Sequence, residues 1–117
     1  IIGVSNDNAY HAITIGSYAD CMMDGFTIQG GNANGSGPLQ SQGGGVLCLG
    51  KASLSRCFIR SNQSHGEGGA IKVVSFGQLS LKQIFVSSDN SSNSGITVAN
   101  DVGSTLEMIV DTQIEAE

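Results

Sequence analysis

The chain has 117 residues, including 17 glycines and one proline, and carries a formal net charge of −5 at pH 7. It holds only five lysines and arginines, and binding to nucleic acid phosphates needs clustered basic side chains, so no nucleic acid partner is expected. No apolar run reaches the ~18 residues of a membrane span, so no transmembrane segment is predicted. Glycine is also a poor helix former, so this glycine-rich composition favours strands over helices.

In chain order, the first predicted strands lie between residues 13 and 28. Short apolar runs alternate there with polar residues and are broken by Gly, Asn and Ser, which is typical of strands. Ile15, Met23 and Ile28 are expected to face inward. A long loop, Gly30–Gly43, follows them.

A repeat begins after this loop. Val46, Ile71 and Ile96 are 25 residues apart, and each follows small residues in the segments GGGVLCL, GGAIKVV and SGITVAN. The second half of the repeat recurs with an offset of 27, which matches Leu54, Cys57 and Ile59 to Leu81, Ile84 and Val86. Going back one repeat, the loop lengthens the offset to 31, which matches Met23, Phe26 and Ile28 to Leu54, Cys57 and Ile59.

A fixed period in this range indicates a solenoid, in which each repeat buries its apolar face against its neighbours. About 25 residues can hold three short strands joined by bends. We therefore predict an all-β fold, a single right-handed parallel β-helix of about four to five coils over residues 1–117. The expected inward columns are Ile15–Cys48–Val73–Val98, Met23–Leu54–Leu81–Leu106 and Ile28–Ile59–Val86–Val110.

The bends are expected at residues that tolerate positive φ. These are Gly25, Gly44, Gly45, Gly68, Gly69 and Gly95, together with Asn32, Asn62 and Asn90. The three asparagines either form a stacked amide ladder or reflect only the turn preference of asparagine.

Several motifs resemble bacterial right-handed β-helix proteins of the pectin-lyase-like superfamily. They are DGFTI at 24–28 with GGNA at 30–33, NAYHAI at 8–13, and CFIRSN at 57–62 followed by GGAI at 68–71. The GGAI element is also similar to repeats of polymorphic outer-membrane proteins, which are surface adhesins and autotransporters. The resemblance covers residues 4 to about 100. It departs from the family pattern at 84–90, where IFVSSDN lacks the cysteine, and in the final coil, which lacks GGA.

The resemblance implies a bacterial extracellular or cell-surface location but no single reaction, because the superfamily includes polysaccharide-degrading enzymes and adhesins. The chain starts directly in apolar strand residues, so we expect a fragment of a larger exported protein that continues the same β-helix. Cys48 and Cys57 are expected inside as small hydrophobes. The three cysteines, with Cys21, are either all free or include one disulfide. His11 is expected to make a structural hydrogen bond and His65 to lie in a solvated turn.

A candidate binding surface comes from the outward positions of the third strand. Phe58 and Phe85 share the 27-residue offset and should stack in one column with Thr27 and Ile109, flanked by Arg60. Aromatic residues are unusual on an outer solenoid face, and three explanations remain open. The loop Gly30–Gly43 could cover them with Leu39 as its lid, a partner or neighbouring domain could do so, or a sugar could stack there. The outward residues Thr14, Leu47, Lys72 and Thr97 are too irregular for an ice-binding face.

The most favoured function is a structural or adhesive surface module that binds a polysaccharide or a protein surface. The alternative is a fragment of a polysaccharide lyase or glycoside hydrolase, which would need carboxylates converging on one outer face. Most acidic residues fall in bends instead, and Asp24 should form a corner ion pair above Ser55 and Lys82. No zinc spacing occurs, and Asn6–Asn8 lacks the pattern of a calcium loop, so no metal, cofactor or catalytic residue is predicted.

Overall fold

The computed structural model describes residues 10–37, 39–87, 89–91, 98–109 and 113–114, and within these ranges the regular elements are all β-strands. None of the described residues belongs to a helix long and apolar enough to cross a membrane. The strands form four parallel sheets. The first sheet contains β1 (Ile13–Ile15), β5 (Val46–Cys48), β9 (Ile71–Val73) and β13 (Val98–Asn100). The second contains β2 (Asp20–Asp24), β6 (Lys51–Ser55), β10 (Gln78–Lys82) and β14 (Thr105–Ile109). The third contains β3 (Thr27–Ile28), β7 (Phe58–Arg60), β11 (Phe85–Ser87) and β15 (Gln113–Ile114), and the fourth contains β4 (Asn32–Ala33), β8 (Gln63–Ser64) and β12 (Asn90–Ser91).

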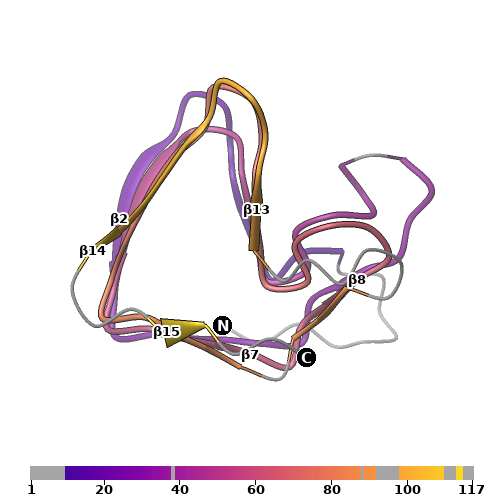
Figure 1. Cartoon of the computed structure of the whole chain (residues 1–117), viewed down its shortest axis with the longest axis horizontal. Coiled ribbons are helices and arrows are strands. Elements are labelled where there is room, and N and C mark those ends of the chain that lie inside the picture. Colours follow the sequence, from indigo (N-terminus) through magenta and orange to yellow (C-terminus); the bar gives the residue numbers. More distant parts are fainter. Residues whose placement is uncertain (1–9, 38, 88, 92–97, 110–112, 115–117) are drawn as a thin grey trace.

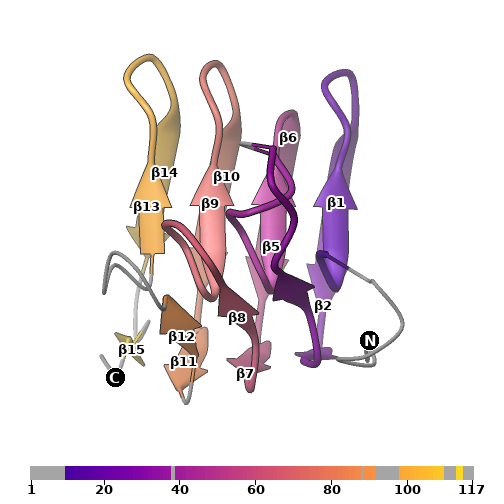
Figure 2. The same cartoon turned by 90° about the vertical axis from the view of Figure 1, so that its right-hand side faces the viewer.

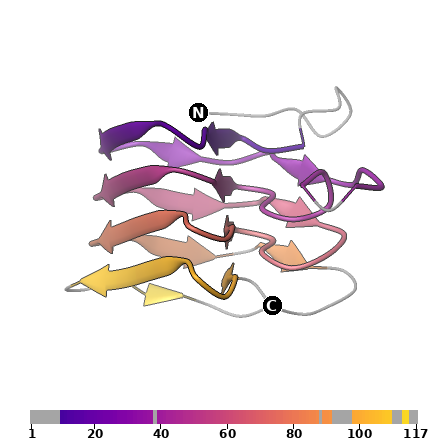
Figure 3. The same cartoon turned by 90° about the horizontal axis from the view of Figure 1, so that it is seen from above.

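Successive strands enter the four sheets in a fixed order, so every fourth strand returns to the same sheet. We call one such passage a rung: β1–β4, β5–β8, β9–β12 and β13–β15. The rungs superimpose in Figure 1 and lie side by side in Figure 2 and Figure 3. The predicted all-β fold with parallel strands is confirmed, with a fourth sheet of two-residue strands that the sequence did not predict. That the strands make one right-handed β-helix stays a prediction.

The register of the first three rungs agrees with the predicted columns. Ile15 pairs with Cys48 and Cys48 with Val73, and the other two columns align in the same way. Alternate residues of these strands form one buried apolar cluster. Its fully buried side chains include Ile28, Leu54, Ile59, Leu81 and Val86.

The register predicted for the last rung was wrong. Val98 pairs with Ile71 instead of Val73, whose partner is Asn100. Leu81 pairs with Met108 instead of Leu106, and Val86 pairs with Ile114. Ile96 and Val110 lie outside the described residues. Each of these shifts is an even number of residues, which preserves the alternation of faces, so the apolar pattern cannot distinguish the two registers.

Positive φ recurs at equivalent bend positions, but not always at the predicted residues. Gly25 (φ 82°) shares its bend with Arg56 (50°) and Gln83 (55°), which are not glycines. Ser61, Phe76, Gly30, Gly43, Gly68 and Gly103 also have positive φ, whereas Gly44, Gly45, Gly69, Asn32 and Asn62 do not. Gly44 is instead required by close approach, because a Cβ there would lie 2.1 Å from the Gln63 carbonyl oxygen. Gly95 lies outside the described residues.

The stacked amide ladder, one of the two alternatives for the asparagines, is not formed, and Asn62 makes a different buried contact. Asn32 and Asn90 both pair with Gln63, so they do not share a column with Asn62. The side chain of Asn62 is buried, and its amide group donates to the carbonyl oxygens of Ile28 and Arg60, each at 3.1 Å. Its side-chain oxygen accepts from the Gly31 N–H at 3.0 Å. Asn62 therefore satisfies backbone groups where the chain leaves the third sheet.

Replacing Gly68 with alanine should destabilise the fold. Gly68 has a φ of 72°, and a Cβ there would lie 2.4 Å from the Ile71 carbonyl oxygen. The backbone conformation alone costs an L-residue about 1–2 kcal/mol, and the contact adds to this. Gly16→Ala is the matched control, since a Cβ there meets nothing within 4 Å. Chemical denaturation should show a clear loss for Gly68→Ala only; equal midpoints would contradict the assigned conformation.

Candidate functional site

The third sheet presents an aromatic pair on its outer face. Phe58 pairs in register with Thr27 on one side and with Phe85 on the other. The two rings lie edge to face, with centroids 6.1 Å apart and an interplanar angle of 61°. Phe58 remains 54% exposed, while its chain neighbour Ile59 is fully buried. The predicted column is thus present in these three residues and points away from the core.

Arg60 completes this surface at the end of β7. It is exposed and lies in register with Ser87, and its Nε–H donates to the side-chain oxygen of Gln29 at 3.0 Å. The structure therefore brings all four predicted residues together, and we call Thr27, Phe58, Arg60 and Phe85 the outer aromatic patch. Ile109 was wrongly placed in this column, since it pairs with Lys82 of the second sheet, and Gln113 pairs with Phe85 instead.

The described residues of the loop Gly30–Gly43 do not cover the outer aromatic patch. Its Ala33 and Ser41 carbonyl oxygens accept backbone hydrogen bonds from His65 and Gly66, at 2.9 and 2.7 Å. Leu39, which would be the lid if the loop covered the patch, is itself 44% exposed. The loop thus lies against the connection between β8 and β9, and Phe58 stays open to solvent.

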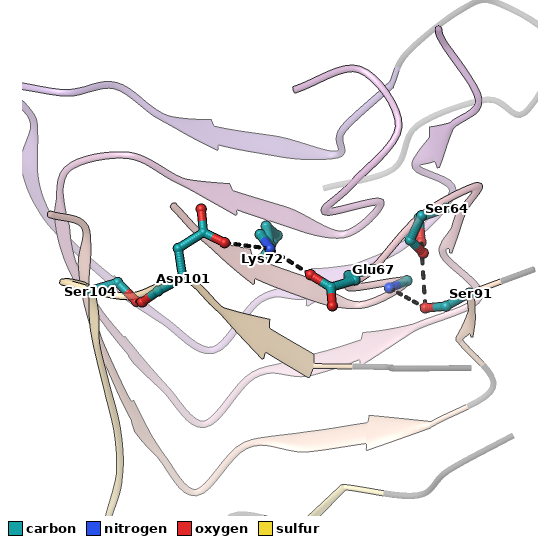
Figure 4. Close-up of polar contacts among 8 residues, drawn as sticks. Ser64, Glu67, Lys72, Ser91, Asp101 and Ser104 are labelled. Atoms are coloured by element: carbon teal, nitrogen blue, oxygen red, sulfur yellow. Dashed lines mark hydrogen bonds and ion pairs between the residues drawn. The ribbon is translucent and has the colours of Figure 1, made fainter. Parts of the chain in front are cut away.

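A second candidate site, a polar cluster that the sequence analysis did not predict, lies on the outer face of the first sheet (Figure 4). Lys72 is the middle residue of β9, and its two neighbours along the strand, Ile71 and Val73, face the core. Its side chain is only 3% exposed, and its Nζ lies 2.8 Å from Glu67 Oε1 and 2.8 Å from Asp101 Oδ1. The two carboxylate side chains are 39% and 37% exposed.

Close approach of the backbone covers Lys72. A Cβ on Gly43 or Gly68 would lie 3.1 or 3.0 Å from the Lys72 Cβ, so both loops need glycine there. Leu47, the neighbour of Lys72 in β5, is likewise buried although it is not part of the core cluster. Leu47 and Lys72 thus lie on the outer face, as predicted, but this face is covered at both positions, whereas Thr14 is exposed. Thr97 lies outside the described residues.

Serine hydroxyls fix the connection that carries Glu67. Ser91 Oγ accepts from the Gly69 N–H at 2.7 Å and lies 3.4 Å from Ser64 Oγ (Figure 4). Ser64 Oγ also donates to the Gly66 carbonyl oxygen at 2.8 Å. These bonds place Glu67 beside the Lys72 ammonium.

The charge of Lys72 is set by two opposing effects. Burial disfavours the ammonium, but hydrogen bonds and Coulombic attraction from Asp101 and Glu67 outweigh it and raise the pKa of Lys72. Lys72 is therefore protonated at neutral pH and bound to both carboxylates. Removing it would leave two acidic groups near each other without their shared cation.

Asp24 forms the predicted corner ion pair, but its partner is Arg56 and not Lys82. Asp24 lies in register with Ser55, and Ser55 with Lys82, as predicted, but its carboxylate accepts from the Arg56 guanidinium, including Nε–H at 2.8 Å. The hydrogen bond from Arg56 lowers the pKa of Asp24. Both side chains are well exposed, so the pair contributes little to stability.

The cysteine and histidine predictions can also be compared with the structure. All three cysteines are free, and Cys48 and Cys57 are buried. Burial raises the pKa of the Cys48 thiol. His11 Nδ1 lies 2.7 Å from the Gly43 carbonyl oxygen, the expected structural hydrogen bond, and His65 is exposed. Within the described ranges no three His, Cys, Asp or Glu side chains gather as a metal site.

Comparison of the chain with protein families, with curated proteins and with solved structures gives no match.

Proposed function

We propose that the chain forms one right-handed parallel β-helix of the pectin-lyase-like superfamily and belongs to a bacterial protein exported to the cell surface. The regular passage through four parallel sheets supports this fold. The DGFTI, GGNA and GGAI motifs support the superfamily and the surface location.

On this fold, the protein serves as a structural or adhesive module whose outer aromatic patch binds a carbohydrate or a protein surface. The observation that carries this proposal is the 54% exposure of Phe58 beside Phe85. The edge-to-face contact restrains the Phe58 ring, so little entropy is lost when a partner covers it. Arg60 and Gln29 add donors and an acceptor next to the apolar ring, a combination found in sugar sites and in protein hot spots alike.

The alternative, a fragment of a polysaccharide lyase or hydrolase, has less support. Glu67, Lys72 and Asp101 offer two carboxylates and a basic group, which is the type of chemistry that such enzymes need. However, Lys72 is 3% exposed and bound to both acids, so it cannot reach a polymer without rearrangement. An assay for release of unsaturated uronates tests the lyase, and an assay for new reducing ends tests the hydrolase.

Phe58→Ser should abolish binding on a glycan array or to an immobilised protein partner while the protein stays folded. The change removes an edge-to-face contact worth about 0.5–1.5 kcal/mol and the apolar area that the 54% exposed ring buries, so a cooperative unfolding transition should remain. Met22→Ser is the matched control, because Met22 is an exposed apolar residue (84%) of the second sheet. Binding by Phe58→Ser at wild-type strength would refute the role of the patch. A response on glycans alone or on protein alone decides between the two ligand classes.

A further inference from the structure

We propose that Lys72 and Asp101 condense to an intramolecular amide cross-link, with Glu67 as the proton relay. The inference is independent of the proposed function, because it rests on the cluster outside the first sheet and not on the outer aromatic patch. Lys72 is a nearly buried amine, and each carboxylate has an oxygen 2.8 Å from its Nζ. The reactants are thus already in contact in the folded chain.

Asp101 is well placed to be the acyl group. Its backbone N–H donates to the Val73 carbonyl oxygen at 2.9 Å, and its own carbonyl oxygen accepts from Ser104 Oγ at 2.6 Å and from the Ser104 N–H at 3.1 Å. These bonds fix the turn after β13, next to Lys72 of the preceding rung. Because both groups are held in the folded chain, the condensation is intramolecular, which lowers its entropic barrier relative to a bimolecular reaction.

The reaction balances without any further reagent. Glu67 takes one proton from the Lys72 ammonium and passes it to an Asp101 carboxylate oxygen. The lone pair of the free amine then attacks the Asp101 carboxyl carbon and forms a C–N bond. The C–O bond to the protonated oxygen breaks, and this oxygen leaves as water with a second proton from the nitrogen. Glu67 ends as a carboxylate, and one ammonium and one carboxylate have become a neutral amide and water.

The resting cluster is the ion pair, so the reaction is slow but needs to happen only once in each molecule. It removes a buried ammonium, whose loss of hydration is otherwise offset only by its two partners. The remaining acid, Glu67, is 39% exposed and stays solvated. The product would join the third and fourth rungs covalently.

Intact-mass measurement of the denatured protein tests the proposal. The wild-type chain should be lighter than its sequence mass by one water molecule. Lys72→Arg keeps a cation beside both acids but cannot form this amide, and it should have its full sequence mass. Glu67→Gln removes the relay and should also retain the water. Lys82→Arg is the matched control and should still show the loss, because Lys82 is exposed in the second sheet.

Peptide mapping identifies the bond. Trypsin should fail to cleave after Lys72, and the peptide that contains Lys72 should be joined to the one that contains Asp101. Mild alkali opens a succinimide at Asp24–Gly25, which would also cost one water, but leaves the amide intact. Folded wild-type protein at its full sequence mass would overturn the proposal, as would a water loss that survives in Lys72→Arg. If Lys72→Arg does not fold, the wild-type mass and peptide map decide alone.

Discussion

Ile59→Asp should abolish folding. Ile59 is fully buried in the middle rungs, between Ile28 and Val86 in the neighbouring strands. A carboxylate there would have no partner, and an unpaired buried charge costs several kcal/mol, which is comparable to the about 5–15 kcal/mol stability of a typical domain. Circular dichroism should show no cooperative thermal transition.

The adjacent residue provides the control for this prediction. Arg60 faces outward and is exposed, so Arg60→Ala should change the free energy of unfolding by less than about 0.5 kcal/mol. If both variants melted like the wild-type protein, the assignment of inward and outward positions in β7 would be wrong.

Asn62→Leu should be strongly destabilising for a different reason. The Asn62 side chain is 1% exposed and satisfies three backbone groups, those of Gly31, Ile28 and Arg60. Leucine has a similar size but no polar atoms, and each buried group left without a partner costs about 1–3 kcal/mol. We therefore expect a loss of about 3 kcal/mol or more in chemical denaturation.

Gln63→Ala is the control for Asn62→Leu, because Gln63 is the next residue and its side chain is exposed. Its effect should stay within about 0.5 kcal/mol. Similar denaturation midpoints for the two variants would show that the backbone groups around Asn62 find other partners.

The sequence was enough to predict which side chains point into the core and which point outward. It was not enough to predict the strand register of the last rung. Alternation distinguishes Ile59 from Phe58 and Arg60 because one residue along a strand changes the face. It does not distinguish Leu106 from Met108 as the partner of Leu81, because both face the same side. Backbone hydrogen bonds and turn lengths decide that register.

The outer aromatic patch was predictable because its residues recur with the repeat, and the Lys72 cluster was not. A lysine between two apolar residues of a strand usually has a solvated side chain. Its burial here depends on the folding back of the segment that carries Glu67 and on a turn of the next rung. The one available signal was the glycine pair Gly43 and Gly68, spaced like Val46 and Ile71, where the backbone passes close to Lys72.

The spacing of the strands shows where insertions can be accepted. Between the second and the fourth sheet, rungs 1 and 2 have the same length. Their paired residues differ by 31 positions at both ends, where Asp20 pairs with Lys51 and Ala33 with Ser64. Among the first three rungs, length varies instead in the segments that flank the first sheet, such as residues 34–45 against 65–70 and residues 49–50 against 74–77. The turn at 49–50 is visibly lower than the others in Figure 2. The segments on either side of the first sheet can thus be lengthened, in evolution or by grafting a foreign peptide for display, without moving the other three sheets.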